Sequence, residues 1–408
     1  MKERLVIKNF GPIKSVDLEL GKMTVLIGEQ ATGKSTIAKV LAVCRYFSFI
    51  TNSSNNLIYI NDIIYVDNIF NEYGIHEYIN EDSHVFYECR DYKLQITNVH
   101  DGKYFMHFNS DNKKPIKMFM PEILEEKSVS FKSLMNEYRN LNIKSVIENF
   151  EHKNSNIPTS FLLNEVKDVM NNPFYFPTER GLQSIFSLGK DSIHNLSSLL
   201  FNQFSKLNEI AINYKNEFDV KPLDITYKNI HGFGYIKKET ENTFYALSTG
   251  ASGYQSAIPI ILGIDYYTNV LKRKNRIFIV EEPELNLFPK AQKKLMEFFV
   301  ENINNNGHSF LLPTHSPYIL SSIENLMYAY TLGNVENGIH KEKVKSIVPE
   351  NYWINPEDVS VYYLNNGEAK NILDRKEALI DKDYIDSVSK ILNDEFDELL
   401  NIEVEYEH

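Results

Sequence analysis

The sequence has little cysteine, no long apolar run and no excess of basic charge. Its 408 residues include only two cysteines, Cys44 and Cys89. Two cysteines argue against a disulfide framework, so a reducing, cytoplasmic setting is expected. No apolar stretch is long enough to span a bilayer, and the N-terminal residues alternate as in a strand instead of forming a secretory signal, so no membrane partner is expected.

The charge balance is acidic, with 55 acidic and 43 basic residues and a formal net charge of -12. A dedicated nucleic-acid binder usually carries a basic surface, so direct binding of DNA is not favoured. Much of the acidity follows residue 380, where it is interpreted either as a solvated helix face and tail or as a docking surface for a basic partner. No sustained heptad pattern is present, so a long coiled-coil arm is not expected.

A glycine-bearing loop follows the first strongly apolar run, at residues 23–27, which is typical of a strand buried on both faces. The loop reads Gly28-Glu29-Gln30-Ala31-Thr32-Gly33-Lys34-Ser35 and is followed by Thr36. It matches the phosphate-binding pattern G-x-x-x-x-G-K-[ST]. Beyond it, apolar residues recur at helical spacing. The segment therefore predicts a phosphate loop between a buried strand and a helix.

The residue types of this loop suit a nucleoside triphosphate. Gly28 and Gly33 let the backbone curl so that its amides point inward, and the helix N-terminus adds partial positive charge. Lys34 is predicted to reach the β- and γ-phosphates, and the Ser35 hydroxyl to bind Mg²⁺. We therefore assign ATP to residues 28–36.

A second motif lies about 250 residues downstream, where the apolar run 277–280 leads into Glu281-Glu282-Pro283-Glu284. Strand alternation predicts that the first two carboxylates point in different directions at the tip of the strand. Glu281 is assigned to Mg²⁺ and Glu282 to the base that accepts a proton from the attacking water. Without the phosphate loop, the same residues could be a solvated acidic turn.

Two further segments are predicted to belong to the same site. His315 ends the next predicted strand, where it could sense the γ-phosphate or hold the attacking water, although a lone histidine is more often structural. The segment 247–256, which contains Ser252, Gly253 and Gln255, places serine and glycine before a helix and so forms another N-terminus suited to anions. Because one triphosphate does not need two such helix ends, this one is expected to contact the nucleotide held by another subunit.

These elements, in this order, resemble the ATP-binding-cassette class of ATPases, and within it the SMC/RecF-like and OLD-type ATPases of bacteria. The resemblance is carried by I-K-N-F-G-P-I-K from Ile7, by E-E-P-E-L-N-L-F-P from Glu281 and by T-H-S-P from Thr314. It implies a head-to-tail homodimer or higher homo-oligomer in which ATP lies between one phosphate loop and the other subunit's signature motif. The signature is either Leu247–Ala251 or Ser252–Gln255, and we prefer Ser252 and Gly253.

Other parts of the family pattern match less well. Asn286 and Phe288 stand where the group often has histidines, and no Q-loop glutamine can be placed. The P-x-E-R element at 177–180 suggests that Arg180 faces the nucleotide, with a structural ion pair as the alternative.

Strands that alternate with helices predict an α/β fold with a mostly parallel central sheet, here an ABC-type ATPase head. The head is assigned to residues 1–45 and 223–408. Residues 46–120 are predicted to form a β-rich, antiparallel insertion with a hairpin at Asp101-Gly102, and residues 121–222 a helical insertion. A second hairpin is predicted at Asn366-Gly367, and an amphipathic helix near the C-terminus.

Chains of this build resemble the ATPase subunits of anti-phage systems such as PARIS and the abortive-infection AbiL type. Fewer than 100 residues follow His315, too few for a Toprim nuclease, so the resemblance implies a separate effector protein, such as a nuclease or a toxin, that acts in trans. The alternatives are a RecF/SMC-like repair ATPase that binds DNA directly and a nucleotide-gated scaffold with negligible turnover. A transporter subunit is the least favoured.

Overall fold

The computed structural model describes residues 3–52, 70–89, 93–99, 103–109, 174–182, 198–335, 340–381 and 393–399. The described strands build one sheet of eleven, with a four-stranded and a two-stranded sheet beside it. In spatial order the large sheet contains β6 (Lys103–Asn109), β5 (Lys93–Val99), β4 (His84–Glu88), β1 (Glu3–Phe10), β2 (Ile13–Leu20), β15 (Glu368–Asn371), β14 (Val359–Asn365), β3 (Met23–Gly28), β13 (Ser309–Thr314), β12 (Ile277–Val280) and β7 (Phe174–Phe176).

The large sheet has a parallel part and an antiparallel part. From β14 to β7, neighbouring strands run parallel, whereas β2, β1, β4, β5 and β6 pair antiparallel. The α/β class with a parallel central sheet is thereby confirmed. Because the carboxyl ends of β3, β13 and β12 lie at one edge, the loops that follow them are brought together, as is usual in open α/β sheets.

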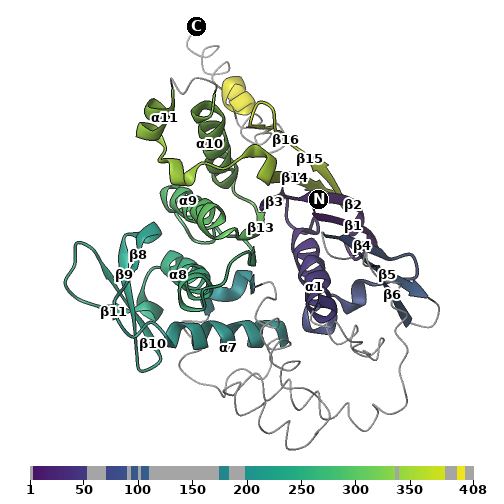
Figure 1. The fold of residues 1–408 in the computed structure, drawn as a ribbon, viewed down its shortest axis with the longest axis horizontal. Helices are drawn as coiled ribbons and strands as arrows, with labels where there is room; N and C mark the ends of the chain where they lie inside the picture. Colours follow the sequence, from purple (N-terminus) through teal and green to yellow (C-terminus); the bar gives the residue numbers. More distant parts are fainter. Residues whose placement is uncertain are drawn as a thin grey trace, which may run out of the picture.

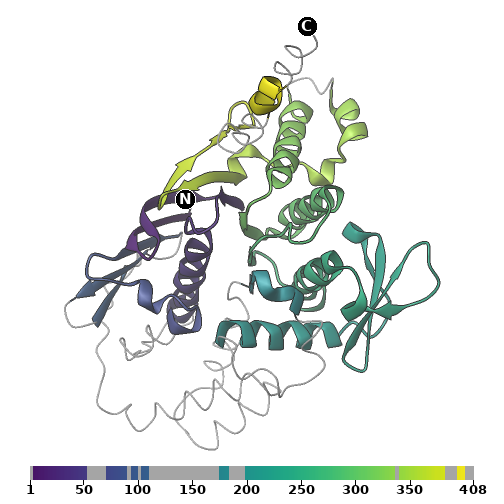
Figure 2. The same ribbon diagram turned by 180° about the vertical axis from the view of Figure 1, so that it is seen from behind.

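Alternation along the central strands explains why both faces of the sheet are covered. Val25 and Ile27 of β3 belong to one hydrophobic cluster, with apolar residues of α8 (Ser252–Asp265), α9 (Pro289–Asn306) and α10 (Pro317–Gly333). Leu26 belongs to the other, with α1 (Lys34–Asn52), β1 and β2. Successive residues of a strand point to opposite faces, so a continuous apolar run is what two buried faces require. Figures 1 and 2 show α1 on one side of the molecule and α8, α9 and α10 on the other.

The predicted division into a head and two insertions stays a prediction, but the described strands cross its boundaries. Strands β4–β6, from the predicted β-rich insertion, continue the sheet through β1. Strand β7, from the predicted helical insertion, pairs with β12 in the central sheet. The Asp101-Gly102 turn lies outside the described residues, as does most of 111–197 apart from β7 and the 3-10 turn η3 (Thr178–Leu182).

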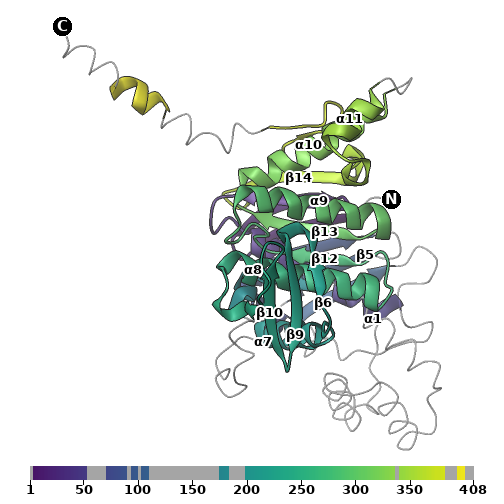
Figure 3. The same ribbon diagram turned by 90° about the vertical axis from the view of Figure 1, so that its left-hand side faces the viewer.

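The second antiparallel sheet packs beside α8. It is ordered β11 (Tyr245–Ala246), β10 (Phe233–Lys238), β9 (Ile225–Ile230) and β8 (Phe218–Val220), and it follows α7 (Ser198–Ile212). Figure 3 shows these strands and α8 next to one another, with α9 lying along β13.

The Asn366-Gly367 hairpin is confirmed, because both turn residues have positive φ, 48° and 80°, as a tight two-residue turn requires. The Gly367 carbonyl accepts hydrogen bonds from the amides of Lys14 (2.9 Å) and Ser15 (3.1 Å), which joins this turn to the start of β2. Near the C-terminus, residues 393–399 are helical and exposed on every side, including Phe396 and Leu399, and the rest of the predicted amphipathic helix lies outside the described residues. No helix in the described part of the chain is both long enough and apolar enough to cross a membrane.

Candidate active site at the carboxyl edge of the central sheet

The phosphate loop joins β3 to α1, as the sequence predicts. Its backbone is left-handed at Ala31 (φ 60°) and Gly33 (φ 98°), which curls the loop around its own centre. A Cβ atom on Gly28 (φ 156°) would lie 2.2 Å from the Leu364 carbonyl oxygen of β14, so only glycine fits there. Strand β14, from the C-terminal part of the described chain, therefore packs directly against the first residue of the loop.

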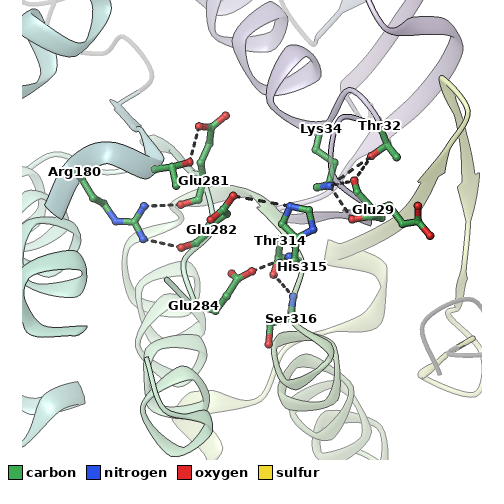
Figure 4. Close-up of polar contacts among 12 residues, drawn as sticks. Glu29, Thr32, Lys34, Arg180, Glu281, Glu282, Glu284, Thr314, His315 and Ser316 are labelled. Carbon is green, nitrogen blue, oxygen red and sulfur yellow. Dashed lines mark hydrogen bonds and ion pairs between the residues drawn. The ribbon is translucent and has the colours of Figure 1, made fainter. Parts of the chain in front are cut away.

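Lys34 folds over this loop. Its Nζ donates hydrogen bonds to the carbonyl oxygens of Gly28 (2.8 Å) and Glu29 (2.6 Å), and lies 3.5 Å from Thr32 Oγ1 (Figure 4). Burial lowers the pKa of Lys34 to about 8, and the nearby carboxylates of Glu282 and Glu284 act in the opposite direction. A cation held in a curl of backbone is well placed to receive phosphate oxygens.

The two neighbouring carboxylates after β12 point in different directions. Glu281 is buried, and its Oε2 accepts a hydrogen bond from Thr178 Oγ1 (3.3 Å). Glu282 turns the other way, toward His315 (Figure 4). Both residues lie beyond the end of β12, and Glu282 adopts a left-handed φ of 42°. Such backbone strain in a non-glycine residue is characteristic of functional sites.

His315 follows β13 and faces Glu282. Its Nε2 lies 3.9 Å from Glu282 Oε1, and its backbone amide donates to Glu284 Oε1 at 2.7 Å. Burial and, to a smaller degree, the charge of Lys34 lower the pKa of His315, so its ring is neutral at neutral pH. The structure therefore places Lys34, Glu282 and His315 along one edge, in the segments that follow three adjacent strands, β3, β12 and β13, as Figure 4 shows.

A family model described as "AAA ATPase domain" (AAA_15) matches residues 1–320. The chain belongs to this family of AAA ATPase domains. Among curated proteins, none matches the sequence.

Several solved structures are similar to this AAA ATPase domain at low sequence identity. The SMC head bound to the C-winged helix domain of ScpA is 11% identical, with a TM-score of 0.45, covering 90% of this chain and 96% of that one. The SMC head domain from Thermotoga maritima is 10% identical, with a TM-score of 0.39, covering 91% and 98%. The Smc head domain from Pyrococcus furiosus, bound to the C-terminal domain of ScpA, is 11% identical, with a TM-score of 0.41, covering 96% and 98%.

The magnesium ligands that the sequence suggests fit the ion chemically. Glu281 Oε1 is buried with no partner at normal hydrogen-bond distance, and the carboxylate lies near the Tyr175 hydroxyl, so it offers an anionic oxygen of the kind that Mg²⁺ takes as a ligand. Ser35 is exposed at the start of α1, and its hydroxyl is available. Mg²⁺ in nucleotide sites usually takes one or two protein ligands together with phosphate oxygens and water, and Ser35 and Glu281 could supply those ligands.

The predicted signature segment begins helix α8 but lies apart from the ATPase domain's own phosphate loop. Ser252 is exposed, and the Ala251 side chain does not cap the helix. The Gln255 side-chain amide donates to the Gly250 carbonyl oxygen (2.9 Å), so it fastens the preceding loop. In Figure 1, α8 and α1 stand apart. These residues are not brought to Lys34 within one chain.

Arg180 lies next to the carboxylate residues. Its side chain is 0% exposed, and its guanidinium donates only to main-chain carbonyl oxygens, those of Pro177, Ser256, Glu281 and Glu282. The expectation that it faces the nucleotide stays a prediction, and in this structure the guanidinium forms no direct ion pair but feels the charges of Glu281, Glu282 and Glu284. The P-x-E-R pattern singles out an arginine that contacts the site. Because Arg180 lies in the 3-10 turn η3, its side chain contacts the backbone of Glu281 and Glu282 from the buried side.

Glu284 is a site residue that sequence reasoning did not assign. Its Oε1 accepts from the His315 amide, and its charge raises the pKa of Glu282. Its Oε2 is buried without a hydrogen-bond partner. The spacing E-E-P-E could have indicated this role. Glu284 follows Glu282 by two positions in a tight turn, so its side chain lies on the same side of the turn as that of Glu282.

The rate is expected to fall in acid at a higher pH than an ordinary glutamate would produce. Burial, followed by the charges of Glu284 and Glu281, raises the pKa of Glu282, while Arg180 and Lys34 act against this. A base works only when deprotonated, so kcat/KM, which reports the free enzyme, should decline as the pH falls through that raised pKa. Steady-state ATP hydrolysis between pH 4.5 and 8, at MgATP concentrations below KM, measures this limb. A kcat/KM that stays flat down to pH 4.5 would contradict the assignment.

Proposed function

We propose that this AAA ATPase domain binds MgATP at the edge formed by the phosphate loop, Glu282 and His315, and hydrolyses it there. The observation that supports this most strongly is the convergence of Lys34, Glu282 and His315, which follow three adjacent parallel strands. The 3.9 Å separation of His315 Nε2 and Glu282 Oε1 leaves both groups within reach of one water molecule.

Each residue then has a definite task. The loop amides and Lys34 bind the phosphates, exchanging the carbonyl contacts of Lys34 for phosphate oxygens. Ser35 and Glu281 hold Mg²⁺, which when bound neutralises the charge on the β- and γ-phosphates. Glu282 takes the proton from the attacking water, and the neutral His315 ring orients that water or the γ-phosphate. Water adds to the γ-phosphorus as the bond to the β-phosphate oxygen breaks, leaving ADP and inorganic phosphate.

We also propose that two copies close each site. The N-terminus of α8 offers free amides and the Ser252 hydroxyl, yet it stands apart from α1 of the same chain. A head-to-tail dimer would bring this helix end to the nucleotide of the partner copy. Hydrolysis per protein molecule should then rise with protein concentration and require Mg²⁺. A specific activity that is constant over a hundredfold dilution would exclude the shared site.

Phe288 offers a test of this dimer. Its side chain is 79% exposed directly after the carboxylate turn, where α9 begins. Burying a phenylalanine contributes about 1.5–3 kcal/mol, so Phe288→Ser should weaken ATP-dependent dimerisation at least about tenfold. Light scattering after gel filtration, in ATP and with Glu282→Gln present to prevent turnover, measures it. Ile347→Ser is the matched control, since Ile347 is 80% exposed on the remote helix α11 (Lys341–Ile347). Equal effects of both variants would place the interface elsewhere.

The dimer is proposed to serve an anti-phage system by holding, sensing or releasing a separate effector such as a nuclease or toxin. The acidic net charge of -12 supports a protein partner over direct DNA binding. The competing role, a RecF/SMC-like repair ATPase, requires phosphate contacts and therefore a steep loss of DNA affinity with salt. Titration of duplex DNA at several salt concentrations, with and without ATP, separates the two. Tight and strongly salt-dependent binding would favour the repair role.

A further inference from the structure

One buried side chain joins three parts of the site that are distant in sequence. Arg180 Nε donates to the carbonyl oxygen of Ser256 in the first turns of α8, at 2.9 Å. Its Nη1 donates to the Glu281 carbonyl oxygen at 2.6 Å, and its Nη2 to that of Glu282 at 2.7 Å. Nη1 also donates to Pro177, which anchors the arginine to its own turn at 3.0 Å. Figure 4 shows the guanidinium beside the backbone of both carboxylate residues.

A second contact lies between the same two parts of the chain. A Cβ atom on Gly253 would stand 2.7 Å from the Asn286 carbonyl oxygen, so the first turn of α8 touches the loop that follows the carboxylates. The Asn286 side-chain amide also lies 3.3 Å from Ser256 Oγ. The start of α8 and the carboxylate turn therefore pack as one unit, with Arg180 beneath it.

We propose that Arg180 is a positioning residue that couples the N-terminus of α8 to the backbone of Glu281 and Glu282. This inference rests on the proposed function, in which α8 meets the nucleotide of a partner copy. When α8 moves onto that nucleotide, Arg180 carries the movement to the carboxylate that works on the chain's own nucleotide. The two sites of a dimer are thereby linked through one guanidinium in each copy.

The chemistry of arginine suits this task better than that of lysine. A guanidinium presents its donors in a rigid plane, so it can hold four carbonyl oxygens in fixed directions, whereas an ammonium is a compact charge on a flexible stem. Glu282 needs such support because its left-handed backbone is strained and persists only where its surroundings fix it. The Glu282 amide donates to the Pro313 carbonyl oxygen (2.8 Å), so this residue is held by hydrogen bonds on both sides.

The test compares Arg180→Lys and Arg180→Gln with Arg276→Lys in the full-length protein. Arg276 is also buried, with its guanidinium 4.3 Å from the centre of the Tyr267 ring, and it immediately precedes β12, at the strand end opposite the carboxylates. It therefore controls for the loss of a buried guanidinium as such. Thermal unfolding, the Kd of a fluorescent ATP analogue, KM and kcat are measured for each variant.

Both Arg180 variants are expected to bind the analogue with unchanged Kd and KM while kcat falls about 100-fold, as a small misplacement of a reacting group produces. Arg276→Lys should lower the unfolding temperature by about as much as Arg180→Lys does. It should nevertheless leave kcat within about twofold of the wild type. A normal kcat in Arg180→Lys would overturn the inference, as would an equal loss of kcat in Arg276→Lys. An inactive wild type would instead refute the proposed function.

A surface variant keeps the inference testable if the Arg180 variants fail to fold. Asn286 is exposed, with φ 59°, so Asn286→Gly retains its backbone conformation and removes its contact with Ser256. We expect kcat to fall several-fold at unchanged ATP affinity. A wild-type kcat in Asn286→Gly, with the Arg180 variants unfolded, would overturn the coupling of α8 to the carboxylates.

Discussion

Glu282→Gln is expected to lower kcat by about 10²–10⁴-fold, the usual contribution of a positioned general base. The amide keeps the size of the side chain but cannot accept the proton of the attacking water. Binding of ATP should persist, since the phosphates are held by the loop after β3 and by Lys34 at the start of α1. The variant should therefore accumulate as an ATP-bound dimer, and a malachite-green phosphate assay together with gel filtration in ATP measures both effects.

The control for this substitution is Glu297→Gln. Glu297 lies on α9 and pairs with Lys293 one turn earlier, away from the site, so its loss should leave kcat unchanged. If Glu282→Gln hydrolyses ATP as fast as the wild type, Glu282 is not the base. If the wild type and Glu282→Gln are equally inactive while both bind ATP, the protein is a nucleotide-gated scaffold instead of an enzyme.

Lys34→Met is expected to weaken ATP binding by about 10- to 100-fold. A hydrogen bond to a charged group contributes roughly 1.5–3 kcal/mol, and methionine supplies the aliphatic stem without the charge. Isothermal titration with MgATP, or with a non-hydrolysable analogue, measures the change. Lys39→Met, a few residues further along α1, controls for loss of a positive charge from the same helix. Comparable losses in the two variants would show that Lys34 contributes only to the general field.

The kcat/KM of the wild type should also fall at high pH, and this fall should be absent in Lys34→Met. Because burial lowers the pKa of Lys34 to about 8, the free protein loses this charge at a lower pH than an ordinary lysine would. A protonated amine binds phosphate, so kcat/KM should be maximal below pH 8 and fall above it, since this parameter reports the free enzyme. A profile that is level to pH 10 would contradict this prediction.

The arrangement of the candidate site could be predicted from sequence because its residues lie in short, contiguous motifs. The loop 28–35, the strand that ends in Glu281 and Glu282, and the strand before His315 each carry a local pattern, and parallel strands bring their carboxyl ends to one edge. The start of α8 at Ser252 and the turn at Asn366-Gly367 were predictable for the same reason.

The contacts of Arg180 and the position of β7 could not be predicted, because they depend on packing between segments that are distant in the sequence. No local sequence pattern indicates such packing. Nothing local indicates that Arg180 turns under the carboxylates, because its partners are carbonyl oxygens and every residue type has one. Likewise, β7 contains three residues, Phe174–Phe176, and its place beside β12 follows from tertiary packing of its aromatic side chains. Domain boundaries drawn by composition therefore cut through a sheet that is continuous.

The position of β3 between β13 and β14 has a consequence for how the protein is made. The strand that carries the phosphate loop leaves the ribosome well before its two neighbours, which are encoded nearly 300 residues or more downstream. The backbone contact between Gly28 and Leu364 can form only after β14 has been synthesised. A nascent chain that stops short of residue 364 therefore cannot form the complete loop. We therefore expect the loop to become able to bind a nucleotide only late in synthesis, after β14 has been made.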